Sequence, residues 1–324
     1  MPIKIPENLP ARQILEDEGV LIIKNTDAIR QDVRPLKIAL LNLMPEKIKT
    51  ETQIARVLGN TPLQVEITLL CPSSYTPKNT TPEHMLDFYK PFDSVTNYKF
   101  DGLIITGAPI ETLEFKDVVY WEELRQIFDW SLENVHGLFN LCWGAQAALF
   151  HFYKIEKYLL TEKKFGIFNH RILDHTSVLT RGLNDVIPVP TSRHTENRRK
   201  DIDPIQNLDI LIESLDAGIC LIHDTKLRHV HMFNHLEYDT NTLNEEYSRD
   251  LIQNKDTKLP LHYFDDNDPK TISANNWRSS GHLLFGNWLN YLYQTTPYNL
   301  NEILIRDRKD LTPLESVTVL KTNK

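Results

Sequence analysis

Residues 135–153 read VHGLFNLCWGAQAALFHFY, and this stretch decides the fold. We expect a buried strand from Val135 to Leu141 that runs directly into Cys142, followed by a helix from Ala145 to Tyr153. Gly144 leaves room for the tight turn between the two. A strand that feeds a helix in this way is the basic unit of a parallel α/β sheet.

The preceding chain repeats this alternation of strands and helices. Leu36 to Leu43 is almost entirely apolar, which is typical of a strand covered on both faces. Further strands are expected at 63–70 and 102–107, with helices at 45–58 and 117–134. The alternation predicts a doubly wound, mainly parallel α/β sheet.

The remaining elements decorate this sheet. Strands are predicted at 208–214, 218–223 and 229–234, the last two joined by a hairpin turn, and a late helix at 283–293. A short helix at 10–18 and a brief strand at 20–23 precede the sheet. No linker is evident, so we expect one main domain, 35–297, an N-terminal extension, 1–34, and a polar C-terminal tail, 298–324.

Composition narrows the class of protein. The chain has 324 residues, 41% of them hydrophobic, and a net charge of −8, which indicates a soluble globular protein and argues against nucleic acid as a partner. We expect no membrane association, because no apolar run reaches the roughly 20 residues of a membrane span. No signal-peptide pattern opens the chain, so a reducing cytoplasmic location is expected. Three widely spaced cysteines indicate neither a disulfide framework nor a zinc module.

Cys142 is the candidate nucleophile. The strand-to-helix turn lifts its side chain above the sheet edge, and the N-terminus of the following helix favours a negatively charged thiolate. The backbone N–H of Trp143 is placed to form half of an oxyanion hole. The alternative is that Cys142 is a buried packing residue like most free cysteines.

A cysteine nucleophile needs a base and a group that orients the base. His235 follows a predicted strand, and Glu237 lies two residues on, so both side chains point to the same side of an extended segment. The pair could otherwise be an ordinary surface pair. His229 and His231 form an H-x-H pair, but because no cysteine or carboxylate cluster joins them we predict no metal site.

The strings CWGAQ at 142–146 and FNHLE at 233–237 resemble the class I glutamine amidotransferase-like superfamily. That resemblance implies a Cys-His-Glu triad of Cys142, His235 and Glu237 on a flavodoxin-like sheet. Two departures argue against a glutaminase. Asn140 stands where the superfamily usually has glycine, and no proline lies between His235 and Glu237.

A closer resemblance is to the homoserine O-acyltransferases of methionine biosynthesis, and it spans nearly the whole chain. It is carried by the strand-to-helix turn around Cys142, residues 139–146, which we call the elbow. The other strings that carry it are NLMPEK at 42–47, TGAP at 106–109, LTRG at 179–182, Ser192-Arg193, FNHLE at 233–237 and Arg249-Asp250.

This resemblance implies a ping-pong acyl transfer. Cys142 takes the acyl group from an acyl-CoA as a thioester, and His235, oriented by Glu237, then deprotonates the hydroxyl of L-homoserine. Lys163 and Arg249 are implied as substrate-binding cations and Ser192 as a pocket residue. Without the resemblance the two cations would be read as solvated surface residues, and Lys164 competes with Lys163 for its role.

In this family the acyl group depends on a position just past TGAP, where succinyl-using members have glycine and acetyl-specific members glutamate. Glu111 therefore predicts acetyl-CoA as the co-substrate, because a carboxylate repels the succinyl carboxylate. No other cofactor is implied. A succinyl-transferring enzyme, a glutaminase subunit and an inactive binding module are the alternatives. The basic run 198–200 is read as a solvated loop, and the extension 1–34 as a contact in a possible homodimer.

Overall fold

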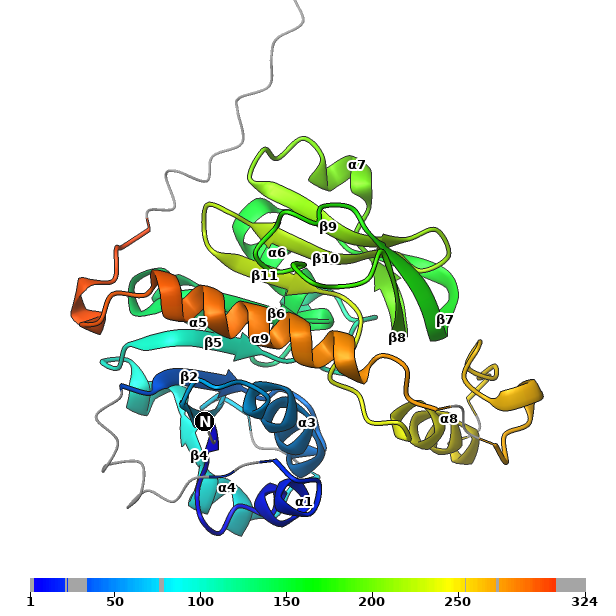
Figure 1. Cartoon of the computed structure of the whole chain (residues 1–324), viewed down its shortest axis with the longest axis horizontal. Helices are drawn as coiled ribbons and strands as arrows, with labels where there is room; N and C mark the ends of the chain where they lie inside the picture. The colour runs from blue at the N-terminus through cyan, green and yellow to red at the C-terminus, as the bar shows by residue number, and fades with distance from the viewer. Residues whose placement is uncertain are drawn as a thin grey trace, which may run out of the picture.

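A computed structural model describes residues 3–20, 22, 34–75, 79–253, 255–271 and 274–306. Within these ranges eleven strands form one sheet, in the order β1-β3-β2-β5-β6-β11-β10-β9-β7-β8, with β4 paired to β3 (Figure 1). The strands are β1 (Ile3–Lys4), β2 (Leu36–Leu41), β3 (Val65–Cys71), β4 (Tyr89–Pro91), β5 (Phe100–Ile105), β6 (Val135–Leu141), β7 (Tyr158–Ile172), β8 (Val186–Glu196), β9 (Leu208–Ser214), β10 (Gly218–Asp224) and β11 (His229–Met232).

The half of the sheet from β1 to β11 is parallel, as the alternation of strands and helices predicts. Its strands are covered on both faces. Along β2, the side chains of Ile38 and Leu40 join one hydrophobic cluster, whereas those of Ala39 and Leu41 join the other. Because successive strand residues point to opposite faces, a strand buried on both sides must be apolar throughout.

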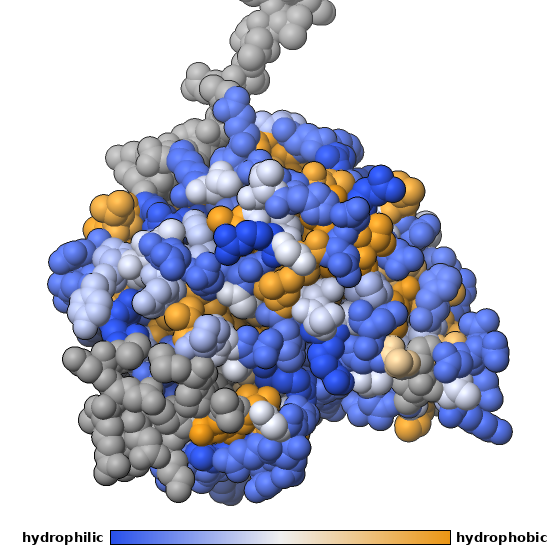
Figure 2. All heavy atoms as spheres, in the orientation of Figure 1, coloured by the Kyte–Doolittle hydropathy of each residue, from blue (hydrophilic) through white to orange (hydrophobic). Residues whose placement is uncertain are grey.

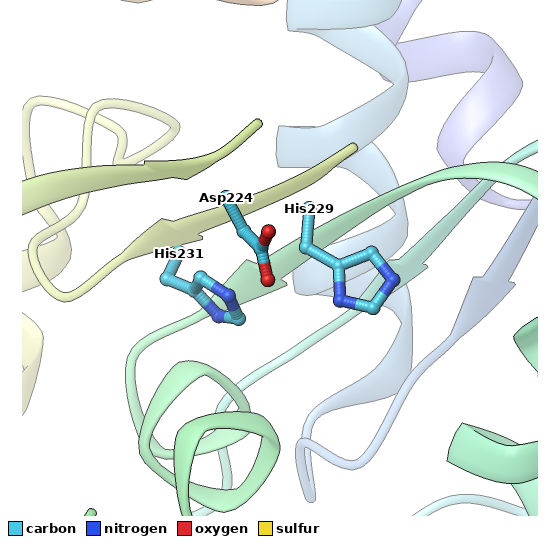
Figure 3. A group of neighbouring side chains, drawn as sticks. All are labelled: Asp224, His229 and His231. Atoms are coloured by element: carbon cyan, nitrogen blue, oxygen red, sulfur yellow. The ribbon is translucent and has the colours of Figure 1, made fainter. Parts of the chain in front are cut away.

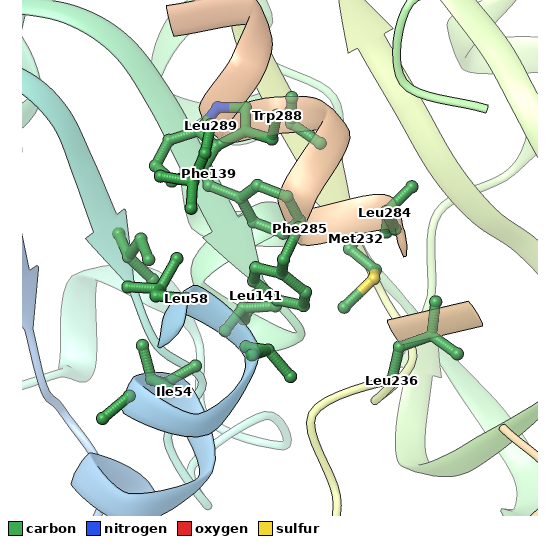
Figure 4. Close-up of a cluster of buried hydrophobic side chains, with 14 of the residues drawn as sticks. Ile54, Leu58, Phe139, Leu141, Met232, Leu236, Leu284, Phe285, Trp288 and Leu289 are labelled. Atoms are coloured by element: carbon green, nitrogen blue, oxygen red, sulfur yellow. The ribbon is translucent and has the colours of Figure 1, made fainter. Parts of the chain in front are cut away.

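Helices lie on both faces of the sheet, so the predicted doubly wound arrangement is confirmed. On one face α1 (Ala11–Asp17) packs on α3 (Lys47–Gly59), and α3 packs on α9 (Arg278–Thr295). Figure 4 shows side chains of α3 and α9 meeting those of β6 and β11 in this cluster. On the other face lie α5 (Trp121–Asn134) and α6 (Trp143–Tyr153).

The half of the sheet from β11 to β8 is antiparallel. The hairpin of β10 and β11 matches its prediction, but the sequence interpretation missed β7 and β8. β8 contains Pro188 and Pro190. Proline is unusual inside a strand because it lacks the N–H that an interior strand donates. The structure accommodates both because β8 is at the end of the strand order and pairs with β7 alone.

One helix on the side of the antiparallel half was also missed. Helix α8 (Thr242–Ile252) buries few side chains, so its apolar stripe is too weak to read as a helix. Helix α4 (Pro82–Phe88), the single turn α7 (Arg199–Ile202) and the 3-10 turns η1 (Phe92–Val95), η3 (Asp265–Asn267) and η4 (Leu300–Glu302) are further short elements.

Several predicted boundaries need correction. The helix expected from residue 117 begins at Trp121, after a short 3-10 turn, η2 (Phe115–Asp117). The strand expected at 102–107 ends at Ile105, which leaves Thr106 and Gly107 in the loop at the end of the sheet. The late helix is longer than predicted and starts at Arg278.

The first and last described segments of the chain are hydrogen bonded to the sheet region. In the N-terminal extension, β1 adds a strand beside β3. Of the strand expected at 20–23, Ile22 forms a bridge, and residues 21 and 23 lie outside the described ranges, as do 307–324 of the tail. Before that point, the Arg306 guanidinium donates to the carbonyl oxygen of Ser131 (3.1 Å) at the end of α5.

The face of the molecule shown in Figure 2 is mostly hydrophilic. On the face shown in Figure 2, apolar residues appear as separated patches among polar ones. Among the described helices, none combines the length and the apolar character that crossing a membrane requires.

Candidate active site

Cys142 lies at the turn between β6 and α6, where the sequence predicts a nucleophile. Its backbone has φ 49° and ψ −117°, a conformation that side-chain-bearing residues seldom adopt. The turn is held by the Cys142 N–H, which donates to the Met232 carbonyl oxygen (2.7 Å) at the end of β11. The parallel pairing of β6 with β11 therefore fixes the position of the thiol.

Gly144 is required by close packing behind the thiol. A Cβ at this position would lie 2.7 Å from the carbonyl oxygen of Thr106 and 3.0 Å from that of Ile105. Gly107 on the neighbouring loop approaches the thiol itself, since its Cβ would lie 3.1 Å from the Cβ of Cys142. The loop after β5 thus borders the nucleophile with backbone and not with a side chain.

His235 and Glu237 meet as predicted from their spacing. Nδ1 of His235 lies 2.6 Å from Oε1 of Glu237, and both residues are buried. The backbone N–H of His235 donates to the Pro190 carbonyl oxygen of β8 (2.8 Å), so the edge strand anchors the histidine. The ring of Tyr238 stacks on the imidazole at a centroid distance of 4.1 Å. These contacts lock the rotamer of His235.

The side chain of Cys142 lines the same cavity as His235 and interacts electrostatically with the histidine. Because Nδ1 faces Glu237, Nε2 is the nitrogen that faces the sulfur. Burial lowers the pKa of His235, but the charges of Glu237 and Cys142 outweigh burial and raise that pKa well above its ordinary value. The arrangement thus favours the imidazolium form of His235, which lies between the carboxylate of Glu237 and the side chain of Cys142.

Trp143 and Asn140 occupy the two sides of the elbow. The Trp143 indole is fully buried and packs against Tyr120, while its backbone begins α6, so its N–H lies beside the nucleophile. Asn140 departs from the amidotransferase glycine, and its side-chain Nδ2 lies 3.4 Å from Nδ1 of His231 on β11. The departure therefore adds a contact between β6 and β11.

A charged cluster lines the same cavity as Cys142 and His235. Nζ of Lys163 on β7 contacts Oε1 of Glu246 (2.7 Å) and Oδ2 of Asp250 (3.3 Å) on α8. Ser192 Oγ on β8 donates to the same Glu246 oxygen (2.6 Å). Arg249 binds Oδ1 of Asp250 (2.9 Å) and is half exposed. In Figure 1, α8 lies near the ends of β7 and β8, the strands that supply these partners.

The two carboxylates of the cluster, Glu246 and Asp250, are stabilised in their charged form by the neighbouring cations. Burial raises the pKa of Glu246, but Lys163 and Ser192 more than offset it, so the pKa of Glu246 is lowered. Likewise, Arg249 and Lys163 lower the pKa of Asp250 against the effect of burial. Two carboxylates and two cations thus share one wall and can bind a ligand that carries both signs of charge.

The structure brings the predicted residues to one cavity of about 550 Å³. Its lining includes the following of them: Cys142, His235, Lys163, Ser192, Arg249 and Glu111. Lys164 is not among the lining residues, which is consistent with the choice of Lys163, because neighbouring strand residues face opposite ways. Glu237 and Trp143 are not among the lining residues. Glu237 contacts His235 on the side away from the cavity, and Trp143 follows Cys142 in the chain.

Among the cavity residues that sequence reasoning missed are Glu246 and Tyr238. A signal for Glu246 existed, because Glu246 and Arg249 are three positions apart, which places them on one face of a helix. Nothing in the sequence indicates the stacking of Tyr238 on His235, because that contact depends on the turn after β11.

The expectation that no carboxylate joins His229 and His231 is wrong. Asp224 lies between the two rings (Figure 3), and one ligand atom of each residue lies within 4.8 Å of the others. Its carboxylate, however, accepts hydrogen bonds from Tyr153 (2.5 Å) and Asn207 (2.8 Å). Burial and the neighbouring charge of Arg306 lower the pKa of His229 well below its ordinary value, and this positive field opposes a bound cation. These contacts favour a structural role.

The other two cysteines lie away from the catalytic cavity. Cys220 is fully buried in β10, and burial raises its pKa to about 12. Cys71 ends β3 and is half-buried, and burial raises its pKa as well. Both thiols are therefore protonated at neutral pH, which is typical of packing cysteines.

Known proteins resemble this chain in sequence and in fold. The model of the homoserine O-succinyltransferase family matches residues 2–298. A relative from Rhizobium rhizogenes, named homoserine O-acetyltransferase, is 53% identical over 303 residues, which cover 94% of this chain and 98% of the relative. A relative of the same name from Acetivibrio thermocellus is 54% identical over 304 residues, 94% of this chain and all of its own length.

A solved glutamine amidotransferase from Thermotoga maritima superposes with a TM-score of 0.56 at 13% identity, over 81% of this chain and 100% of that one. At this identity the likeness shows the fold alone. The prediction of a class I glutamine amidotransferase-like fold is confirmed.

Proposed function

The chain belongs to the homoserine O-succinyltransferase family, and we propose that it transfers an acetyl group from acetyl-CoA to the hydroxyl of L-homoserine. One observation carries the proposal. Cys142 and His235, with Glu237 behind the histidine, face the same cavity as a wall with two cations and two carboxylates. The array suits acyl transfer through a thioester, and the wall suits an amino-acid zwitterion.

In the first half-reaction the thiolate of Cys142 attacks the carbonyl carbon of the acetyl thioester. The developing oxyanion is stabilised by backbone N–H groups, for which Trp143 and the loop 107–111 are the candidates. The carbon–sulfur bond to CoA then breaks, and the leaving thiolate takes the proton of the His235 imidazolium. The acetyl group remains on Cys142 and His235 is neutral.

In the second half-reaction neutral His235 accepts the proton of the homoserine hydroxyl as its oxygen attacks the acetyl carbon. The bond from that carbon to Cys142 breaks, and O-acetylhomoserine leaves. Glu237 stabilises the imidazolium that forms. Homoserine is held by its two charges, with its carboxylate on Lys163 and Arg249 and its ammonium on Glu246.

Acetyl is favoured over succinyl as the acyl group by Glu111, which lines the cavity that holds Cys142. A carboxylate there would repel the terminal carboxylate of a succinyl group and occupy its space. The relatives named homoserine O-acetyltransferase support this choice, whereas the family model carries the succinyl name.

Competition between donors tests the proposal. The purified full-length chain is mixed with equal concentrations of acetyl-CoA and succinyl-CoA without homoserine, and intact mass reports which acyl group is added to the protein. We expect the acetyl adduct to dominate and to disappear when homoserine is added. A dominant succinyl adduct would identify the alternative donor, and glutamine hydrolysis without any adduct would favour a glutaminase.

Matched cysteine variants assign the adduct to its residue. Cys142→Ala should remove the adduct completely, while Cys71→Ala, which changes a thiol away from the cavity, should retain it. An adduct that persists in Cys142→Ala and is lost in Cys71→Ala contradicts the mechanism. An inactive binding module would form no adduct in any variant.

A further inference from the structure

A second cavity, of about 260 Å³, adjoins the catalytic one. Met44, Ala108 and Pro109 line both, so the two are separated by little more than these side chains. The lining of the second cavity is mainly apolar and aromatic, with Tyr75 and Tyr120 in edge contact at 5.6 Å. Among its described lining residues Asp117 is the one charged side chain.

The topology of the sheet makes this position a ligand site. From β2 the chain moves to β3 on one side, and from β5 it moves to β6 on the other, while β2 and β5 are neighbours. The crevice outside the carboxyl ends of β2 and β5 is therefore the switch point, where open α/β sheets bind ligands. Residues 43–45 and 108–120, which follow these two strands, supply most of the lining.

The two cavities differ in chemistry, and so do the two substrates. The charged wall of Lys163 and Glu246 suits the homoserine zwitterion, whereas the second cavity offers no comparable set of charges among its described residues. The pantetheine arm of CoA is long, uncharged and partly apolar. We propose that the second cavity holds the pantetheine arm of the acyl-CoA donor, with the thioester lying over Cys142. This assignment rests on the proposed function.

The segment 108–113 forms the wall between the two sites. Glu111 and Thr112 line the catalytic cavity, whereas Ile110 and Leu113 line the second one. Nζ of Lys157 donates to the carbonyl oxygens of Glu111 (2.7 Å) and Leu113 (2.8 Å), which fixes this turn. The same segment can therefore contact the acyl group with one side and the pantetheine arm with the other.

A hydrogen bond also joins the two loops at the switch point. The N–H of Leu43 donates to Oγ1 of Thr106 (2.8 Å), so the loops after β2 and β5 are held together at the base of the crevice. A preformed site of this kind binds a flexible arm without first ordering its own walls, which reduces the cost of binding.

Val119 provides the test, because it lines the second cavity, is 78% exposed and is not among the residues that line the catalytic cavity. Val119→Trp should fill the mouth of the second cavity. Initial rates are measured with acetyl-CoA and with acetyl-N-acetylcysteamine, a thioester that lacks most of the pantetheine arm. We expect the KM for acetyl-CoA to rise about tenfold or more, while the KM values for the short thioester and homoserine stay unchanged.

The matched control is Val178→Trp, which adds the same bulk at an exposed valine outside both cavities. It should change neither KM. Lys258→Glu probes the opposite rim of the catalytic cavity. A raised acetyl-CoA KM in Lys258→Glu but not in Val119→Trp overturns the assignment, as does an equal rise for both thioesters in Val119→Trp. If the unaltered protein acetylates homoserine from neither thioester, the proposed function itself fails.

Discussion

The elbow at Cys142 and the charged wall around Glu246 face one cavity but are built differently. The elbow is held by the parallel strands β6 and β11, and the neighbours of Cys142 in the chain, Leu141 and Trp143, are buried. The wall combines β7, β8 and α8, and its Arg249 is half exposed. A rigid, enclosed site suits the bond-making steps, whereas a more open wall suits binding and release of a small substrate. Changes in the elbow should therefore act on kcat, and changes in the wall on KM.

The largest effect expected from a conservative change is at Glu237. Glu237→Gln keeps the size of the side chain but removes a charge that raises the pKa of His235, so His235 becomes a weaker base and its imidazolium form is less favoured. We expect kcat to fall by about 10²–10⁴-fold with the homoserine KM nearly unchanged. The rate of Cys142 alkylation by iodoacetamide at neutral pH should fall too. Glu213→Gln, on the surface of β9, is the control.

The same pair predicts a pH dependence. Because the pKa of His235 is raised in the folded protein, the stability from its protonated form is present below the ordinary histidine pKa and is lost as pH rises through the folded value. Glu237→Gln should flatten that dependence in urea unfolding measured from pH 6 upward. If Glu237→Gln changes neither the pH dependence of stability nor the rate of Cys142 alkylation, the charge of Glu237 does not act on His235. The expected difference between changes in the elbow and changes in the wall would then be contradicted.

The wall should respond in KM. Glu246→Gln removes the proposed acceptor of the homoserine ammonium and leaves Lys163 paired with Asp250. The KM for homoserine should rise about 10- to 100-fold, as for loss of a hydrogen bond to a charged group, with acyl-enzyme formation from acetyl-CoA unaffected. Glu245→Gln is a matched control, because its side chain pairs with Lys49 on the surface. A slower acyl-enzyme step in Glu246→Gln would assign it to the chemistry instead.

The contrast also explains what the sequence could predict. The elbow is local, because its strand, nucleophile, glycine and helix lie within residues 135–153, and buried parallel strands carry an unmistakable apolar run. The wall depends on residues more than fifty positions apart, such as Ser192 and Glu246. The prolines in β8 hide its strand pattern in the sequence, and few side chains of α8 are buried, so its helical pattern is weak. Tertiary packing, not local pattern, brings these residues together.

A smaller effect is expected at Glu111, on the wall between the two cavities. Glu111→Gly removes both charge and bulk and should raise the ratio of succinyl to acetyl transfer about tenfold or more, measured as kcat/KM for each donor. Glu111→Gln keeps the bulk and removes only the charge, so it separates the effect of charge from the effect of size. Glu114→Gly, in the same loop but not among the residues that line either cavity, should leave the ratio unchanged. A ratio that stays constant in Glu111→Gly contradicts the selectivity argument.

The smallest catalytic effect is expected at Cys220, which lies near the triad in the sheet but carries no chemistry. Cys220→Ser places a hydroxyl in a fully buried site and should lower the free energy of unfolding by about 1–3 kcal/mol in urea. Cys71→Ser, at a half-buried position, should cost less, about 1 kcal/mol or below. Both variants should form the acetyl-enzyme at the unaltered rate. The rate of acetyl-enzyme formation in Cys220→Ser could fall by more than the fraction of unfolded protein explains. That result would mean that the catalytic region extends past the elbow into β10.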